Sequence, residues 1–311
     1  MSSRNTIVAG LILVLAIGLL IVVNSCSKQT PAPTEITPPP MPPTPTETAP
    51  AQTIRQIGST TVLPIAEAWQ KAFNKLHPEV KIAVSGGGSG AGIKALIDGT
   101  CEIANASRAI KDQEVTQAQA AGVEPVEHVV AFDGIAVIVH PDNPIAELSV
   151  EQLSDIFSGE VTAWKNVGGQ AGQIQIISRD SASGTYESFK ELVVTLHGKA
   201  KDRDYAPEAL KQASNQAVLT TVAQTPSAIG YVGLGYLDDT VKAVKVIPIG
   251  GGDAVAATAE NVQNGSYPIS RELYMYTNGE PSGAVKEYLD WGLGSDAQAI
   301  VAEKGFVSIA K

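Results

Sequence analysis

The chain has 311 residues, 44% hydrophobic and 17% charged, and a formal net charge of −10. These proportions are those of a globular protein and exclude wholesale disorder. An acidic chain lacks the broad cationic surface that nucleic acids bind, so we expect no nucleic-acid partner and, for any anionic ligand, a local site. The two cysteines, Cys26 and Cys101, and the four scattered histidines lack metal-ligand spacing. We therefore expect no disulfide framework, metal or cofactor.

The first 26 residues have the pattern of a secretory signal. Arg4 precedes an uncharged apolar run from Ile7 to Val23, and the segment 23–26 (VNSC) resembles a lipobox, in which Cys26 is lipidated after cleavage. An uncleaved helical anchor is the alternative. Either way, we expect the globular part to lie outside the cytoplasm, held at the outer face of the cytoplasmic membrane. Residues 27–53 are rich in Pro and Thr and predict an extended tether.

Beyond the tether, strand and helix patterns alternate. In chain order we expect a strand at 54–57, a helix at 64–76, a strand at 80–84, a helix at 93–98, strands at 102–104, 134–139 and 173–178, and helices at 186–195 and 282–303. The run 134–139 is continuously apolar, as in a strand that is buried on both faces. This alternation predicts an α/β architecture with covered sheets.

Four polar loops follow expected strands, and three of them lead into a helix. They are 58–61 (GSTT), 85–92 (SGGGSGAG), 106–108 (ASR) and 178–185 (SRDSASGT). Helix N-termini favour anions, glycine allows close backbone approach, and hydroxyls add donors. Arg179 adds a fork of donors suited to an oxyanion. Each loop alone is typical of a helix cap or a flexible turn, but together they predict an oxyanion receptor.

Enzyme motifs are incomplete in these loops. The glycine loop lacks the Gly-Lys-Ser/Thr ending of a P-loop, since Lys94 follows Ile93. The segment 181–184 lacks the glycine that a nucleophile elbow carries two places before its serine, and no histidine is placed as a base. We therefore expect binding without catalysis.

The chain from Ile54 to Lys311 resembles the PstS family, the phosphate-binding proteins of the phosphate-specific ABC importer. The matching segments are 58–61 (GSTT), 88–90 (GSG), 106–108 (ASR), 132–137 (FDGIAV), 153–164 (LSDIFSGEVTAW), 179–185 (RDSASGT), 229–231 (IGY) and 267–271 (YPISR). The resemblance implies a two-lobed type II periplasmic-binding fold with a two-strand hinge. The first lobe would comprise 54–133 and 268–311, and the second 134–267. The implied partners are inorganic phosphate and the importer's permease subunits, and we expect a monomer.

The resemblance also implies a set of phosphate contacts. The family's contacts map onto Thr60, Thr61, Ser89, Ser107, Asp133, Arg179, Ser183, Gly184 and Thr185. Some relatives carry an aspartate where this chain has Ser181, and its absence leaves Arg179 less constrained.

Asp133 is the residue expected to set specificity. A buried carboxylate beside an anion needs a hydrogen bond from that anion, and phosphate carries a proton that sulfate lacks at neutral pH. A buried acceptor with no proton to meet costs on the order of 1–3 kcal/mol. The simpler interpretation is that Asp133 caps a turn before Gly134.

Three alternatives remain open on sequence grounds. They are a binding protein for another oxyanion such as sulfate or molybdate, a secreted phosphoesterase, and a surface phosphate sensor. We interpret Cys101 as a small buried hydrophobic residue.

Overall fold

The computed structural model describes residues 53–309. The predicted signal segment, the lipobox with Cys26 and nearly all of the predicted tether lie outside the described residues. Thr53, the last residue assigned to the tether, begins the first strand. Within residues 53–309, no helix has the length and apolar character needed to cross a membrane.

Strands and helices alternate along the chain, and the predicted α/β class is confirmed. The strands are β1 (Thr53–Gly58), β2 (Lys81–Ser85), β3 (Ile103–Ala106), β4 (Pro125–Val139), β5 (Glu147–Ser149), β6 (Gln175–Arg179), β7 (Leu210–Gln212), β8 (Ala228–Gly233), β9 (Lys242–Ala243), β10 (Lys245–Ile247) and β11 (Ser270–Asn278). The α-helices are α1 (Leu63–Leu76), α2 (Ser89–Ile97), α3 (Asp112–Ala120), α4 (Val150–Phe157), α5 (Gly184–Phe189), α6 (Asn215–Gln224), α7 (Ala259–Gln263), α8 (Gly283–Gly292) and α9 (Ser295–Glu303).

One sheet runs through the described residues in the order β2-β1-β3-β11-β4-β8-β6-β7, with β9 beside β4. β1, β2 and β3 are parallel, and so are β6, β7 and β8. Between these groups, β4 and β11 pair antiparallel, and Arg271 lies opposite Asp133. The carboxyl ends of parallel strands share one edge of a sheet, and the loops that follow them form the usual ligand site of such folds.

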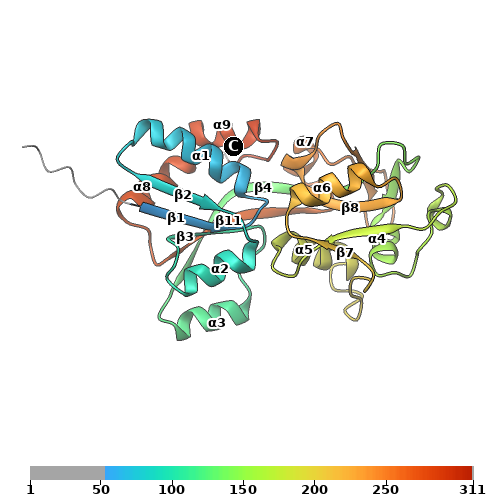
Figure 1. Cartoon of the computed structure of the whole chain (residues 1–311), viewed down its shortest axis with the longest axis horizontal. Helices are drawn as coiled ribbons and strands as arrows, with labels where there is room; N and C mark the ends of the chain where they lie inside the picture. The colour runs from blue at the N-terminus through green and yellow to red at the C-terminus, as the bar shows by residue number, and fades with distance from the viewer. Residues whose placement is uncertain (1–52, 310–311) are drawn as a thin grey trace, which may run out of the picture. The chain divides into compact units, whose positions relative to one another are not determined.

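The hydrophobic core is divided along β4 and β11. Two of the hydrophobic clusters together contain buried residues of β4 up to Ala131 and of β11 from Leu273 onward. The third contains buried residues of β4 from Ile135 onward, and near β11 it includes only Ile269, which precedes that strand. We call the parts around these cores the first and second lobe, respectively. β4 and β11 therefore run from one lobe into the other (Figure 1).

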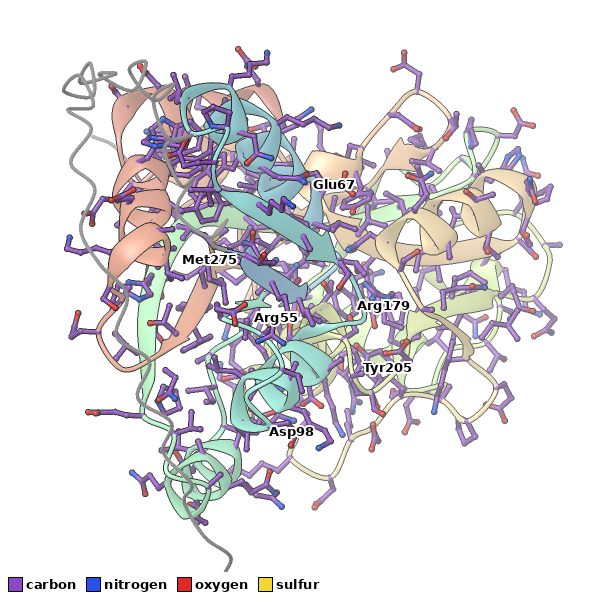
Figure 2. All side chains as sticks on the ribbon, turned by 60° about the vertical axis from the view of Figure 1, so that its left-hand side comes forward. Arg55, Glu67, Asp98, Arg179, Tyr205 and Met275 are labelled. Carbon is purple, nitrogen blue, oxygen red and sulfur yellow. The ribbon has the colours of Figure 1, made fainter. Side chains whose placement is uncertain are left out.

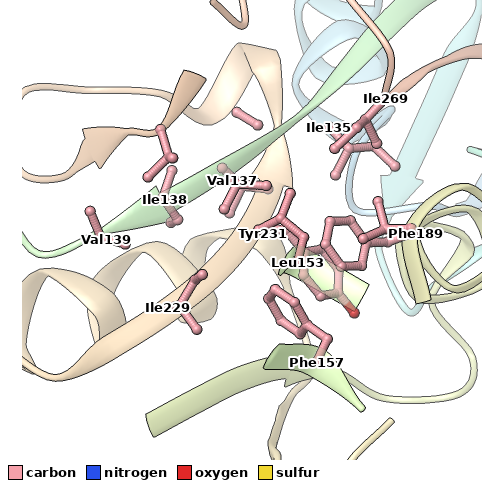
Figure 3. Packing of buried hydrophobic residues seen from close by; sticks show 14 of the residues in the cluster. Ile135, Val137, Ile138, Val139, Leu153, Phe157, Phe189, Ile229, Tyr231 and Ile269 are labelled. Atoms are coloured by element: carbon pink, nitrogen blue, oxygen red, sulfur yellow. The ribbon is translucent and has the colours of Figure 1, made fainter. Parts of the chain in front are cut away.

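Helices cover both faces of the first-lobe strands. α1, α8 and α9 pack on one face and α2 and α3 on the other (Figure 1). α1 is amphipathic because Ile65, Ala66, Trp69 and Phe73 recur at helical spacing, and all four are buried. In the second lobe, aromatic rings pack against the apolar run of β4 (Figure 3).

Several element boundaries differ from the sequence prediction. The helix predicted at 186–195 begins at Gly184 and continues after Phe189 as a π-helical turn, Lys190–Val194. α2 begins at Ser89 and not at residue 93, because the glycines hold it against β1: a Cβ at Gly92 would lie 2.5 Å from the Ile57 carbonyl oxygen. The stretch 282–303 is two helices that break at Leu293 and Gly294, where glycine weakens helix propensity. The strand predicted at 134–139 is the second half of β4, which starts at Pro125.

Candidate functional site

All nine predicted site residues are buried where the two lobes meet. The first lobe contributes the loop after β1, the start of α2 and the residue after β3. The second lobe contributes the end of β6 and the first turn of α5. Hydrogen bonds cross between the lobes: the Gly90 N–H donates to the Ala182 carbonyl at 3.0 Å, and the Ser188 hydroxyl to that of Ser107 at 3.1 Å. The four loops predicted to be anion receptors thus converge.

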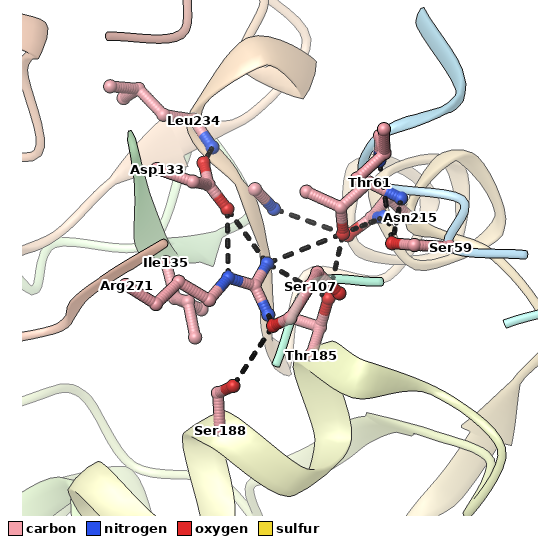
Figure 4. Close-up of polar contacts among 12 residues, drawn as sticks. Ser59, Thr61, Ser107, Asp133, Ile135, Thr185, Ser188, Asn215, Leu234 and Arg271 are labelled. Atoms are coloured by element: carbon pink, nitrogen blue, oxygen red, sulfur yellow. Dashed lines mark hydrogen bonds and ion pairs between the residues drawn. The ribbon is translucent and has the colours of Figure 1, made fainter. Parts of the chain in front are cut away.

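Asp133 has no exposed surface and forms an ion pair with Arg271 across β4 and β11 (Figure 4). Its Oδ2 accepts from Nη2 of Arg271 at 2.7 Å and from Nε at 3.1 Å, while its Oδ1 accepts from the Leu234 N–H at 2.9 Å. Burial raises the pKa of the Asp133 carboxyl, and the charge of Arg271 opposes that shift. The alternative that Asp133 caps a turn is wrong, since Asp133 and Gly134 both lie inside β4.

Arg179 ends β6 and is 1% exposed (Figure 2). Its Nε donates to the Gln212 carbonyl at 3.1 Å, and its Nη2 to the Ala213 carbonyl at 3.1 Å and the Thr60 hydroxyl at 3.2 Å. The two carbonyls constrain the guanidinium although residue 181 is a serine. Burial lowers the pKa of Arg179, yet a guanidinium stays charged in proteins.

Within residues 53–309, not every hydrogen-bond donor of Arg179 is satisfied. Its buried Nη1 has no hydrogen-bond partner, and none of the ion pairs within residues 53–309 includes Arg179. An orphaned buried donor on a cation is costly unless a ligand satisfies it. The buried charged side chains at this junction are thus two guanidiniums, Arg179 and Arg271, and one carboxylate, Asp133. Asp180 also acts on Arg179 but is only partly buried, so the fully buried charges do not balance.

Ser89, Ser107 and Gly184 form a close-packed group. Ser89 Oγ accepts from the Ser107 N–H at 3.0 Å, and the Ser107 carbonyl accepts from Nη1 of Arg271 at 3.0 Å. A Cβ at Gly184 would lie 2.3 Å from Ser89 Oγ and 2.6 Å from Ser107 Oγ. Only glycine at this position lets the start of α5 approach both serines. Ser183 is the cap of α5, because its hydroxyl accepts from the Tyr186 N–H at 3.2 Å.

The threonines join the two lobes directly. Thr61 Oγ1 and Thr185 Oγ1 are 2.9 Å apart, and Nη2 of Arg271 lies 3.3 and 3.0 Å from them, respectively (Figure 4). Asn215 Nδ2 donates to Thr61 at 3.0 Å and to Thr60 at 3.3 Å.

Sequence reasoning did not include Arg271 and Asn215 among the site residues. Arg271 belongs to the segment 267–271 that carries the family resemblance, which is the signal that could have identified it. Its role depends on the register of β11 against β4, and a sequence alone does not show this. Asn215 follows the capping residue Ser214 at the start of α6 and looks like an ordinary helix residue.

The fold and this convergent polar site define the chain as a substrate-binding protein with the predicted type II periplasmic-binding fold. A family model described as a PBP superfamily domain matches residues 43–296. A Clostridium perfringens protein whose structure holds bound phosphate superposes with a TM-score of 0.74 at 34% identity, covering 83% of this chain and 100% of the other. An ABC-type phosphate transport receptor from Vibrio cholerae gives 0.64 at 30% identity, covering 82% and 99%.

More specifically, the chain belongs to the PstS family of phosphate-binding proteins. It is 33% identical over 254 residues to the phosphate-binding protein PstS of Bacillus subtilis, covering 81% of this chain and 79% of the relative. It is 31% identical over 273 residues to that of Pseudomonas aeruginosa, covering 82% and 83%. The family predicted from the sequence is confirmed.

Proposed function

We propose that this chain captures inorganic phosphate between its two lobes and delivers it, without catalysis, to the permease subunits of an ABC importer. The observation that carries the proposal is the buried charge balance at the lobe junction. Arg179 and Arg271 outnumber Asp133 by one charge, and Nη1 of Arg179 is a buried donor that has no partner in the described part of the chain. A buried oxyanion supplies both the missing charge and the missing acceptor.

The hydrogen bonds of Asp133 favour phosphate as the ligand over a fully ionised oxyanion such as sulfate. A carboxylate offers about four acceptor positions. Among residues 53–309, three hydrogen bonds reach Asp133: two from Arg271 and one from Leu234, the last being the only one on Oδ1. One position on Oδ1 therefore remains for a proton carried by the ligand. Monohydrogen and dihydrogen phosphate have such a proton.

The nine predicted residues stand as proposed phosphate contacts, with Arg179 and Asp133 as the donor and acceptor that define the ligand. Ser183 is the weakest of the nine, since its oxygen already accepts the helix-capping hydrogen bond. The proposed lobe limits, 54–133 with 268–311 and 134–267, are supported by the division of the core between Ala131 and Ile135.

Calorimetric titration of the purified, ligand-free chain tests the binding step. We expect one-to-one phosphate binding and no signal with sulfate or molybdate. Asp133→Asn should reduce the difference in affinity between phosphate and sulfate, because the amide can donate a hydrogen bond to an unprotonated oxygen. Sulfate binding as tight as phosphate would reject the ligand, and steady hydrolysis of a phosphoester by the pure protein would reject the non-catalytic role.

Delivery and anchoring need separate experiments. We propose that Cys26 carries the lipid that holds a monomeric chain at the outer face of the cytoplasmic membrane. Cys26→Ser should abolish incorporation of a labelled fatty acid and release the chain from membranes. Phosphate uptake by vesicles that contain the permease should require the added chain. Retention of the Cys26→Ser chain in membranes would favour the uncleaved helical anchor.

A further inference from the structure

Asn215 is fully buried and is the first residue of α6. Its Oδ1 accepts from the Gly233 N–H at 3.2 Å, and its Nδ2 faces the hydroxyls of Thr61 and Thr60 at 3.0 and 3.3 Å (Figure 4). A backbone N–H can only donate, so the atom facing Gly233 must be the amide oxygen. The two N–H groups of the amide are therefore directed to the two threonine hydroxyls, one to each.

This contact determines what the Thr60 hydroxyl can do. A hydroxyl has two lone pairs and one O–H. Thr60 Oγ1 receives one N–H from Asn215 and another from Nη2 of Arg179 at 3.2 Å. Both lone pairs are thereby used by groups that cannot accept. Its O–H is left, and it has no acceptor within residues 53–309.

The Thr61 and Thr185 hydroxyls are likewise surrounded by hydrogen-bond donors. They lie 2.9 Å apart, Asn215 donates to Thr61, and Nη2 of Arg271 donates toward both. One hydrogen of this Nη2 goes to Asp133, so the other is shared between the two threonines. Whichever hydroxyl donates to its neighbour, the O–H of the other has no acceptor among the residues that the structure describes.

We propose that Asn215 is a positioning residue that fixes the threonine hydroxyls as hydrogen-bond donors toward the bound anion. This rests on the proposed function, since the anion is the acceptor that the free O–H groups and Nη1 of Arg179 require. Thr60 and Thr61 belong to the first lobe and Asn215 to the second. The donor arrangement is therefore completed only when the lobes meet.

Two substitutions separate this role from a structural one. Asn215→Asp keeps the shape and the acceptor for Gly233, but it turns the threonine-facing donor into an acceptor that draws the O–H groups away from the ligand. Asn215→Leu removes both functions without adding an acceptor. We expect phosphate affinity to fall about 100-fold or more in Asn215→Asp and about 10-fold in Asn215→Leu. A structural role predicts the reverse order, with Asn215→Asp close to wild type.

The added charge of Asn215→Asp is separated from donor reversal by a double-mutant cycle with the combined change Thr60→Val and Thr61→Val, since Asn215 contacts both hydroxyls. If Asn215 acts through these hydroxyls, the loss of phosphate affinity caused by Asn215→Asp shrinks several-fold when both threonines are replaced by valine. An equal loss with and without the threonine hydroxyls would mean that the charge acts directly on the anion, and this would overturn the proposal. Asn143→Asp adds the same charge at another buried asparagine of the second lobe, whose Oδ1 accepts from the Ile145 N–H at 3.0 Å. It should leave affinity unchanged.

Calorimetry carried to millimolar phosphate, with a melting curve of each full-length variant, provides the readout. If Asn215→Asp does not fold, the cycle is run with Asn215→Leu, and additive losses of phosphate affinity with the combined Thr60→Val and Thr61→Val change would overturn the proposal. Failure of the wild-type chain to bind phosphate would overturn the proposed function, and this proposal with it. That outcome is visible before any variant is measured.

Discussion

Replacing Arg271 by methionine tests the buried ion pair that links β4 to β11. Asp133 has no exposed surface and the Arg271 side chain is 6% exposed, so little water can replace the lost charge. Removing one partner of a buried pair costs about 3–5 kcal/mol, because the other charge stays buried and uncompensated. We expect Arg271→Met to lower the free energy of unfolding at pH 7 by about this amount. Urea unfolding without phosphate, followed by circular dichroism, measures it.

The stability cost of Arg271→Met depends on pH. Without Arg271, the buried Asp133 favours its neutral form, and its folded-state pKa rises further above the unfolded value. The penalty is therefore largest at neutral pH. It shrinks as pH falls through the raised folded-state pKa and is lost below the unfolded pKa, where the carboxyl is protonated in both states. Unfolding at pH 7 and pH 5 should show this change in Arg271→Met.

A double variant and an exposed pair serve as controls. Asp133→Asn with Arg271→Met removes both charges and should recover part of the lost stability. Lys94 pairs with Asp98 at 2.6 Å, with side-chain exposures of 74% and 45%. Lys94→Met should therefore cost about 1 kcal/mol or less. The ion-pair explanation is wrong if the double variant is as unstable as the sum of its single changes, or if Arg271→Met costs no more than Lys94→Met.

Three further predictions concern packing and buried ionisable groups. Gly184→Ala places a methyl group 2.3 Å from Ser89 Oγ, so it should weaken phosphate binding at least ten-fold by calorimetry, and the overpacking should also lower the melting temperature. Burial raises the pKa of the Cys101 thiol to about 12, so a maleimide at pH 8 should label this cysteine in urea but not in the folded chain. Burial likewise raises the pKa of Tyr231 to about 12. Between pH 10 and pH 12 only the unfolded state ionises this tyrosine, so its contribution to the free energy of unfolding should fall by about 1.4 kcal/mol per pH unit. Urea titrations at alkaline pH should show the loss of stability with pH reduced by this amount in Tyr231→Phe.

The sequence was informative where function depends on loops that follow strands. The loops that hold Ser107, Arg179 and Thr185 could be identified because each follows an apolar strand, and the resemblance to a known family then indicated the individual residues. The carboxyl ends of parallel strands then place them together. The α/β class followed from the same alternation.

The missed residues depend on contacts between distant parts of the chain. Arg271 acts through Asp133, 138 positions away, because the antiparallel pairing of β11 with β4 places Arg271 opposite Asp133. Asn215 acts through Thr60 and Thr61, about 155 positions away, across the meeting of the lobes. Neither distance leaves a local pattern, so residue type and spacing could not reveal these roles.

The division of the site between the lobes implies that the anion drives closure. Thr60 and Thr61 come from the first lobe, Arg179 from the second, and Arg271 from the strand that joins them. The positive charge of Arg271 acts against that of Arg179 and lowers its pKa, so two like charges are held near each other when the lobes meet. An anion between them removes this repulsion and accepts from both lobes at once. Because it makes these contacts only in the closed arrangement, it binds that arrangement more tightly and shifts the population toward it.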